Sequence, residues 1–413
     1  MARPHRSIDH GIVKRSLFLP LGIVALYLAF FFALLTPFFQ RHFIFLHSIR
    51  FPFFADFSRP SRYGLAPFKA RNIQLTTHDQ EKIGAWHILP EPFYQAHIAE
   101  RHQQSIQSAE EAVAHIDDEV YAQALREYPT ILYLHGNAMS RAAPFRIGAY
   151  TSLTGRIDAN VVAIDYRGFG DSSGSPSEDG LVEDAHAAYR WILSHHRPTE
   201  QSTPTPPITV FGQSLGTGIA ALLAAKLESL GSPVDNVVLM APYANLRLLV
   251  KDYRLGGMIP VLAPLRGLPF HDYLLTKFMK THLNTLKALP RLFTHRAIPD
   301  GPASDPTQTA PSRRGTRVVL LHAADDPIIP VTHSRRLFTA LTKHCQPETI
   351  QKRNIDGFAE MRRFTCDDHN GIEKQVTLIE TQFGGHNHLT EGALDLVALA
   401  CDLPSAFVKR NVS

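Results

Sequence analysis

The 413-residue sequence contains only three cysteines, Cys345, Cys366 and Cys401, all late in the chain. Three are too few for a disulfide framework or a zinc site, so we expect ordinary thiols in the core or on the surface. Concentrated positive charge is also lacking, because 42 Lys and Arg against 38 Asp and Glu give a net charge of only +4 over the whole chain. Nucleic-acid binding needs a concentrated basic surface, so we expect no nucleic acid as a partner.

Charged residues are absent between Ser16 and Phe39. A helix of this length, at about 1.5 Å per residue, can cross a hydrocarbon core about 30 Å thick. We therefore predict a transmembrane anchor at 16–39, preceded by a basic flank at 1–15 and followed by a linker at 40–71. Basic residues are more frequent just before the span than just after it, which favours a single-pass protein with a cytoplasmic N-terminus and a lumenal body.

A cleavable signal peptide is the alternative for this segment. The apolar region of a signal peptide is usually about 7–15 residues long and ends in small residues. The segment here is longer and ends in Leu-Thr-Pro-Phe-Phe, which favours the anchor.

From residue 72 onward, short apolar runs rich in β-branched residues alternate with helix-like stretches. This alternation is typical of a mostly parallel sheet with helices on both faces, and we predict one α/β domain at 72–413 with eight strands. The strands are expected at 72–76, 83–89, 130–134, 160–165, 208–212, 236–240, 317–322 and 377–382.

Three segments interrupt this pattern. Residues 91–128 are polar and rich in Ala, Glu, Gln and His, which indicates a helical surface insertion. Residues 246–289 carry many Leu, Met and Phe between two predicted core strands, so a mobile lid and an ordinary pair of packing helices both remain open. Residues 299–314 are crowded with Pro, Thr, Ser and Gly and are expected to form a flexible loop.

A Gly-x-Ser-x-Gly motif occurs at Gly212, Ser214 and Gly216, directly after a predicted strand and before a helix-like stretch. A serine hydroxyl is a poor nucleophile unless a sharp turn exposes it beside a base. Glycines two residues to either side let such a turn close without side-chain collisions. In this strand–turn–helix context the motif predicts Ser214 as a nucleophile.

A nucleophilic serine that attacks an ester creates negative charge on the carbonyl oxygen, which backbone amides must stabilise. The amide of Leu215, directly after the serine, is one candidate. The second donor is expected in the turn after the third predicted strand, where Asn137 and Ala138 follow His135-Gly136. We expect His135 itself to hold this loop by hydrogen bonds.

The base and the acid are expected downstream, in the chain order serine, acid, histidine. His386 follows two glycines after the last predicted strand and is the preferred base, with His388 as the alternative. The acid usually lies four residues beyond a histidine at the end of the preceding strand, which from His322 indicates Asp326, with Asp325 as the alternative. A site of this kind requires neither a metal nor a cofactor.

Five motifs of the sequence, the serine turn among them, occur together in one known family. In these motifs the chain resembles the membrane-bound monoacylglycerol and lysophosphatidylserine lipases of the α/β-hydrolase superfamily. They are His135-Gly-Asn137, Asp165-Tyr-Arg-Gly-Phe-Gly-Asp-Ser172, Ser175-Pro-Ser-Glu178, Gly212-Gln-Ser-Leu-Gly-Thr-Gly218 and His322-Ala-Ala-Asp-Asp-Pro327.

The resemblance implies an α/β-hydrolase fold and an integral membrane enzyme of the endoplasmic reticulum, with the membrane bilayer and a lipid or acyl-ester substrate as its partners. It implies hydrolysis of monoacylglycerols or lysophospholipids through an acyl-enzyme intermediate, with Ser214, Asp326 and His386 as the triad. The chain departs from the family pattern at Gln213, where a histidine is common, and in the insertions 91–128 and 299–314. Related membrane hydrolases with these motifs remove palmitoyl groups from proteins.

A protein depalmitoylase and a small-ester carboxylesterase with the same triad therefore remain alternatives. A membrane-tethered binding module without activity is the alternative outside enzymes. No triad position is missing from the sequence, which favours an enzyme.

Overall fold

The protein is described by a computed structural model that covers residues 10–99, 116–196, 205–252, 270–294, 315–367 and 372–405. The predicted loop 299–314 lies outside these residues. Parts of three other predicted segments also lie outside, namely 1–9 of the basic flank, 100–115 of the insertion and 253–269 of the possible lid.

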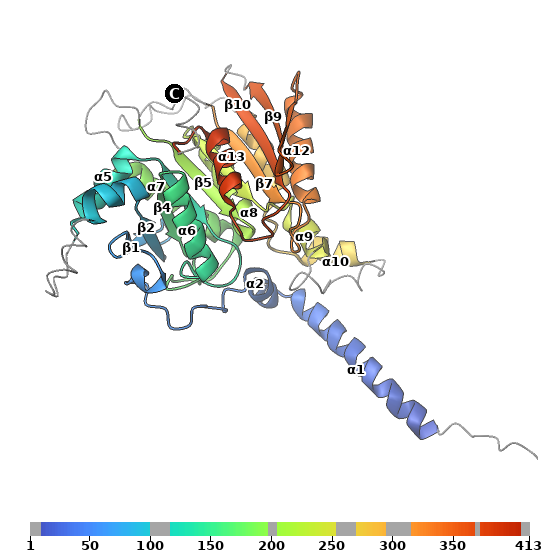
Figure 1. Ribbon diagram of the computed structural model, residues 1–413. Helices are drawn as coiled ribbons and strands as arrows, with labels where there is room; N and C mark the ends of the chain where they lie inside the picture. The colour runs from blue at the N-terminus through green and yellow to red at the C-terminus, as the bar shows by residue number, and fades with distance from the viewer. Residues whose placement is uncertain are drawn as a thin grey trace, which may run out of the picture.

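A ten-stranded mixed sheet forms the centre of the protein (Figure 1). Its strands lie in the order β1-β2-β4-β3-β5-β6-β7-β10-β9-β8. The neighbours from β4 to β10 pair in parallel, whereas the two strands at each end pair antiparallel. The strands are β1 (Ala70–Thr76), β2 (Lys82–Ile88), β3 (Thr130–Leu134), β4 (Asn160–Ile164), β5 (Ile208–Gln213), β6 (Asn236–Met240), β7 (Arg317–Ala323), β8 (Gln351–Ile355), β9 (Ala359–Asp367) and β10 (Glu373–Thr381).

All eight predicted strands are present, but the predicted number was wrong because β8 and β9 were missed. β8, at the edge of the sheet, consists of four exposed polar residues followed by the half-buried Ile355, and β9 carries two consecutive arginines. Neither strand has the apolar run of a strand buried on both faces. Asp356 and Gly357, which connect the two strands, both have positive φ angles, as in the tight turns that close antiparallel hairpins.

Helices cover both faces of this sheet, as predicted. In Figure 1, α6 and α13 lie in front of the sheet, and their apolar residues form one core cluster with alternate strand residues. The other strand residues face a second cluster that includes α7, α8 and α12. The helices are α1 (His10–Leu34), α2 (Pro37–Phe45), α3 (Glu91–Tyr94), α5 (Asp118–Glu127), α6 (Pro144–Arg156), α7 (Glu178–His195), α8 (Leu215–Ser229), α9 (Leu246–Asp252), α10 (His271–Phe278), α11 (Thr285–Ala288), α12 (Thr332–Cys345) and α13 (Glu391–Cys401), with short 3₁₀ turns at Pro60–Tyr63 and Leu289–Leu292 and a π turn at Gln95–Ala99.

The predicted anchor is not one straight helix. The α1 helix ends at Leu34 and α2 begins at Pro37, and the two helices are bent by 96°. The break has a local cause, since a proline disfavours helical geometry in the residue before it, here Thr36. Within the described residues no single helix is long and apolar enough to cross a membrane, whereas this bent pair meets the criteria when taken together.

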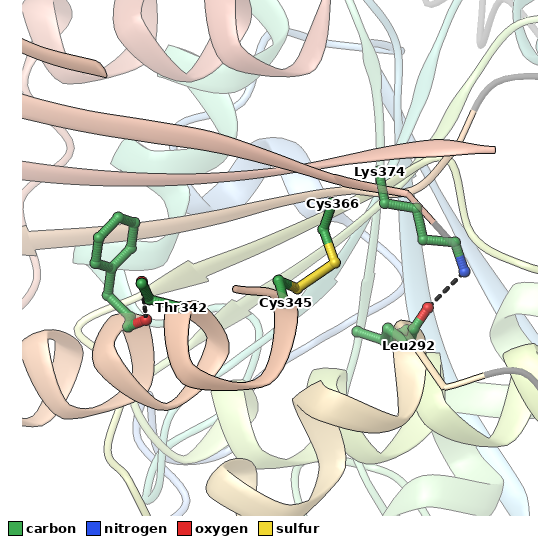
Figure 2. Close-up of a disulfide and its surroundings, with 6 residues drawn as sticks. Leu292, Thr342, Cys345, Cys366 and Lys374 are labelled. Carbon is green, nitrogen blue, oxygen red and sulfur yellow. Dashed lines mark hydrogen bonds between the residues drawn. A yellow bond between two sulfur atoms is a disulfide. The ribbon is translucent and has the colours of Figure 1, made fainter. Parts of the chain in front are cut away.

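A disulfide joins Cys345 and Cys366, so the expectation of free thiols was wrong for these two residues. Figure 2 shows Cys345 at the end of α12 reaching Cys366 on β9, with the two Cα atoms 5.5 Å apart. Cys401 is free and buried, and burial raises the pKa of its thiol to about 12. The disulfide ties the edge hairpin β8–β9 to the helix that covers it.

Candidate active site

The predicted serine turn lies between β5 and α8. Ser214 is half-buried and has φ 51° and ψ −117°, a conformation that L-residues rarely adopt. A Cβ atom at Gly216 would overlap the Leu134 carbonyl, and one at Gly212 would overlap the Gly216 backbone. The close approach of neighbouring backbone therefore leaves no room for a side chain at either glycine of the motif.

The structure brings Ser214 together with two of its predicted partners. The Ser214 hydroxyl donates a hydrogen bond to Nε2 of His386 at 2.9 Å. Nδ1 of His386 donates to Oδ2 of Asp326 at 2.8 Å. Asp326 follows β7 and His386 follows β10, and these two strands are parallel neighbours, so both loops leave the same edge of the sheet.

The Asp326 side chain is fully buried, and its environment favours the charged carboxylate. Its Oδ1 atom accepts hydrogen bonds from the amides of Ile328 and Ile329 at 2.8 and 3.0 Å. Burial alone would raise the pKa of Asp326, but hydrogen bonds from His322 and His386 hold the pKa below its usual range. An ionised carboxylate at this place can orient the imidazole and stabilise its protonated form.

The alternative residues lie outside this hydrogen-bonded chain. The Asp325 carboxylate accepts a hydrogen bond from the Gly385 amide at 2.8 Å. His388 is exposed, and its backbone amide donates to the Gly384 carbonyl at 3.2 Å. The geometry therefore favours Asp326 over Asp325 and His386 over His388.

The candidate oxyanion donors differ in their availability. Leu215 is the first residue of α8, where a backbone amide has no partner within its own helix. The Ala138 amide already donates to the Phe45 carbonyl at 2.9 Å, which argues against Ala138 as a donor. For the Asn137 amide, no acceptor is found among the described residues. A Cβ atom at Gly136, one residue earlier, would lie 3.2 Å from the Ser214 Cβ atom, so this loop adjoins the serine.

Gln213, which departs from the family pattern, connects the serine turn to the histidine loop. The side chain is buried and donates to Oδ1 of Asn387 at 2.9 Å. It also accepts a hydrogen bond from the Tyr133 hydroxyl. The glutamine thus links β3, β5 and the residue that follows His386, a role that sequence reasoning missed.

Sequence reasoning also missed the groups that hold the loop after β3. His135 is buried, and its Nδ1 donates to the Gly136 carbonyl at 2.6 Å, a hydrogen bond within the loop of the kind expected. The buried side chain of Arg146 on α6 donates to carbonyls of the same loop. Neither a motif nor a spacing marks this arginine in the sequence.

Metal ligation has little support in the part of the chain that the structure describes. No group of three or more His, Cys, Asp or Glu side chains lies there in an arrangement that could hold a metal ion. The chemistry available at the site is that of a serine activated by a histidine and a carboxylate.

Residues 129–258 match the family model described as alpha/beta hydrolase fold. The chain is 31% identical over 306 residues to "Lysophosphatidylserine lipase ABHD12" of Danio rerio, an alignment that covers 73% of this chain and 66% of the relative. It is 30% identical over 331 residues to the protein of the same name in Xenopus tropicalis, with 80% of this chain and 72% of the relative covered. The chain thus spans about two thirds of the Danio rerio protein.

A solved structure, "Crystal structure of alpha-beta hydrolase (ABH) from Vibrio vulnificus", is also similar. It aligns with a TM-score of 0.43 and 15% sequence identity, covering 81% of this chain and 80% of the other.

Proposed function

The chain belongs to the family of the ABHD12 lysophosphatidylserine lipases and is a serine ester hydrolase, and from this premise we propose that it cleaves the acyl esters of single-chain lipids at Ser214. The substrates proposed are lysophospholipids or monoacylglycerols. The observation that carries the proposal is the chain of hydrogen bonds from Ser214 through His386 to Asp326, at 2.9 and 2.8 Å. The alternative of a binding module without activity is set aside, since the Danio rerio and Xenopus tropicalis relatives are named as lipases and all three triad positions are occupied.

In the proposed reaction, His386 accepts the hydroxyl proton as Ser214 attacks the ester carbonyl. The carbonyl oxygen becomes negatively charged and accepts hydrogen bonds from the amides of Leu215 and Asn137. Protonated His386, stabilised by the Asp326 carboxylate, then passes its proton to the departing alcohol. Water then attacks the acyl-enzyme while His386 accepts its proton. His386 returns the proton to Ser214 as the fatty acid leaves, and no metal or cofactor is required.

The lipid nature of the substrate is supported by an apolar pocket between the N-terminal helices and the helices α9 and α10. It is lined almost entirely by apolar side chains from α1, α2, α9, α10 and the residue after α10, among them Phe31, Ile44, Val250 and Met279. The Ile44 carbonyl lies 3.5 Å from the side-chain nitrogen of Asn137, so the pocket adjoins the loop after β3. Two of these helices come from the segment 246–289, which we propose as a lid over the acyl chain.

Membrane attachment through α1 and α2 is part of the proposal. Apolar side chains of α1 are widely exposed, and the exposed aromatic rings continue through Phe38 and Phe39 of α2 to Phe53 and Phe54. Aromatic rings are favoured at the interface between a membrane and water. The most economical account of this exposed surface is that the bilayer covers it.

A lumenal catalytic domain is proposed on the evidence of the disulfide Cys345–Cys366. Disulfides persist in oxidising compartments and are rare in the cytosol. The endoplasmic reticulum, the compartment implied by the resemblance to the family, provides such conditions. Protease protection of sealed microsomes tests this assignment, and digestion of the catalytic domain without detergent would contradict it.

The enzymatic proposal is tested with purified full-length protein and its Ser214→Ala variant. The wild type is offered 1-oleoyl-lysophosphatidylserine, monooleoylglycerol, a palmitoyl-cysteine peptide and p-nitrophenyl acetate. We expect the wild type to prefer the two lipids, and the variant to lose both hydrolysis and labelling by a fluorophosphonate probe. Preference for the peptide would favour a depalmitoylase, and preference for the acetate a carboxylesterase. Full labelling of Ser214→Ala would refute the nucleophile.

A further inference from the structure

A buried arginine lies directly behind the candidate oxyanion loop. Only 1% of the surface of Arg146 is exposed. Its Nη1 atom donates to the carbonyl of Ser140 at 2.8 Å, and its Nη2 atom lies 3.1, 3.3 and 2.8 Å from the carbonyls of Gly136, Asn137 and Ala138. Among the described residues, no carboxylate forms an ion pair with this guanidinium. Burying an unpaired cation is costly, and here backbone carbonyls and the ring of Phe145, whose centroid lies 5.3 Å from the guanidinium carbon, compensate the cost.

The amides of the same loop are held by the last residue of α2 and by the segment that follows it. The three bonds run from Ala138 to the Phe45 carbonyl at 2.9 Å, from Met139 to the Ile49 carbonyl at 2.8 Å and from Ser140 to the Phe51 carbonyl at 3.2 Å. Both the carbonyls and the amides of the loop 136–140 therefore form hydrogen bonds. The Asn137 amide is the exception, since it has no acceptor among the residues described.

Because a peptide group is planar, the hydrogen bonds to the Gly136 carbonyl also fix the direction of the Asn137 amide. In a trans peptide the C=O of one residue and the N–H of the next point in opposite directions. The Gly136 carbonyl is fixed by Arg146 and by Nδ1 of His135, at 3.1 and 2.6 Å. The Asn137 amide must therefore point away from these two side chains, and it lies in the loop that adjoins Ser214.

We propose that Arg146 is a positioning residue that aims the Asn137 amide at the oxyanion of the reaction. This inference rests on the proposed function, because it assumes that an oxyanion forms at Ser214. The hydrogen bonds of Arg146 all go to backbone carbonyls, so its effect on catalysis passes through the Asn137 peptide. A preorganised donor stabilises the transition state more than the bound ester, so the arginine should influence kcat rather than KM.

The test compares Arg146→Lys and Arg146→Gln with the wild type in the full-length protein. Lysine is a single point donor and cannot reproduce the fork of the guanidinium. Loss of one oxyanion donor costs about 10²–10³-fold in kcat, and we expect a loss of this order with KM changed less than about threefold. Affinity for an alkyl boronic acid, whose tetrahedral adduct carries an oxygen in the oxyanion position, should fall with kcat/KM.

The matched control is Arg156→Lys, on the same helix. Arg156 donates to the Asp395 carboxylate at 2.7 and 2.8 Å and does not contact the loop. Because it is a partly exposed ion pair, we expect kcat within about threefold of the wild type.

The outcomes separate the inference from the function on which it rests. Retention of activity by Ser214→Ala would overturn the proposed function itself. Wild-type kcat in Arg146→Lys and Arg146→Gln, with Ser214→Ala inactive, would overturn the positioning role alone. Loss of a cooperative thermal transition in both arginine variants would also overturn it, because Arg146 would then be required for folding rather than for orienting one amide.

Discussion

The Asp325 side chain accepts a hydrogen bond from the Gly385 amide at 2.8 Å, one residue before the histidine that contacts Ser214. Its neighbour Asp326 contacts the imidazole of His386 itself. Two consecutive carboxylates thus hold the same loop at different points. Asp325 fixes the backbone of the loop, and Asp326 fixes the ring that the loop carries.

This division predicts unequal effects for the two isosteric substitutions. Asp326→Asn should lower kcat by about 10³–10⁴-fold, because the amide favours the wrong tautomer of the imidazole and cannot stabilise its charged form. Asp325→Asn keeps an acceptor oxygen for the Gly385 amide and should lower kcat by less than about tenfold. Steady-state hydrolysis of monooleoylglycerol measures both. A larger loss in Asp325→Asn would reverse the assignment of the acid.

The lowered pKa of Asp326 also predicts how stability depends on pH. A carboxyl group with a folded-state pKa below its unfolded value of about 3.9 stabilises the fold fully above that value, and the contribution is lost as pH falls through the folded pKa. The difference in unfolding free energy between wild type and Asp326→Asn should therefore shrink as pH falls below about 4. Urea unfolding between pH 7 and pH 3 measures this difference.

The control for this series is Glu391→Gln, a largely exposed residue at the start of α13. Its difference from the wild type should stay small and nearly constant over the same range. A difference for Asp326→Asn that grows toward low pH would contradict the direction of the pKa shift.

The serine turn of the candidate site can be recognised in the sequence because its local geometry demands particular residues. Ser214 needs a sharp turn, and the turn needs Gly216, since the Leu134 carbonyl leaves no room for a side chain. The central strands were equally predictable, because burial on both faces requires apolar residues throughout.

The missed features depend on groups that the sequence does not distinguish. The Phe45 carbonyl holds the Ala138 amide through backbone atoms, which every residue has. Arg146 is one of 42 basic residues, and only the fold places it behind the loop. The disulfide between Cys345 and Cys366 depends on β9, which carries Cys366. The charged residues of β9 do not resemble a core strand, so the sequence did not predict it.

The disulfide predicts a stability that depends on redox conditions. Cys345 and Cys366 are 21 residues apart, and a loop of this length contributes about 3 kcal/mol to the free energy of unfolding in the chain-entropy model. Reduction should lower the stability of the wild type by about this amount and leave Cys345→Ser unchanged. Urea unfolding with and without dithiothreitol measures both. Reaction of Cys345 and Cys366 with maleimide in the native, unreduced protein would contradict the disulfide.

The contacts between the N-terminal segment and the loop after β3 predict that two truncations behave differently. Removal of residues 1–35 deletes α1 and leaves all three carbonyl acceptors of the loop, at Phe45, Ile49 and Phe51. This variant should hydrolyse a water-soluble ester with nearly the kcat of the wild type, because α1 contributes none of these hydrogen bonds.

Removal of residues 1–51 deletes the acceptors as well, together with Ile44 and Phe45, which belong to the main core cluster. The freed amides of Ala138, Met139 and Ser140 would then let the loop move, and the Asn137 amide with it. We expect kcat per folded molecule to fall at least about 10²-fold, as when an oxyanion donor is lost. Hydrolysis of p-nitrophenyl butyrate measures kcat, and circular dichroism measures the folded fraction. Equal kcat values for the two truncations would show that the segment 44–51 serves membrane attachment and core packing without holding the active-site loop.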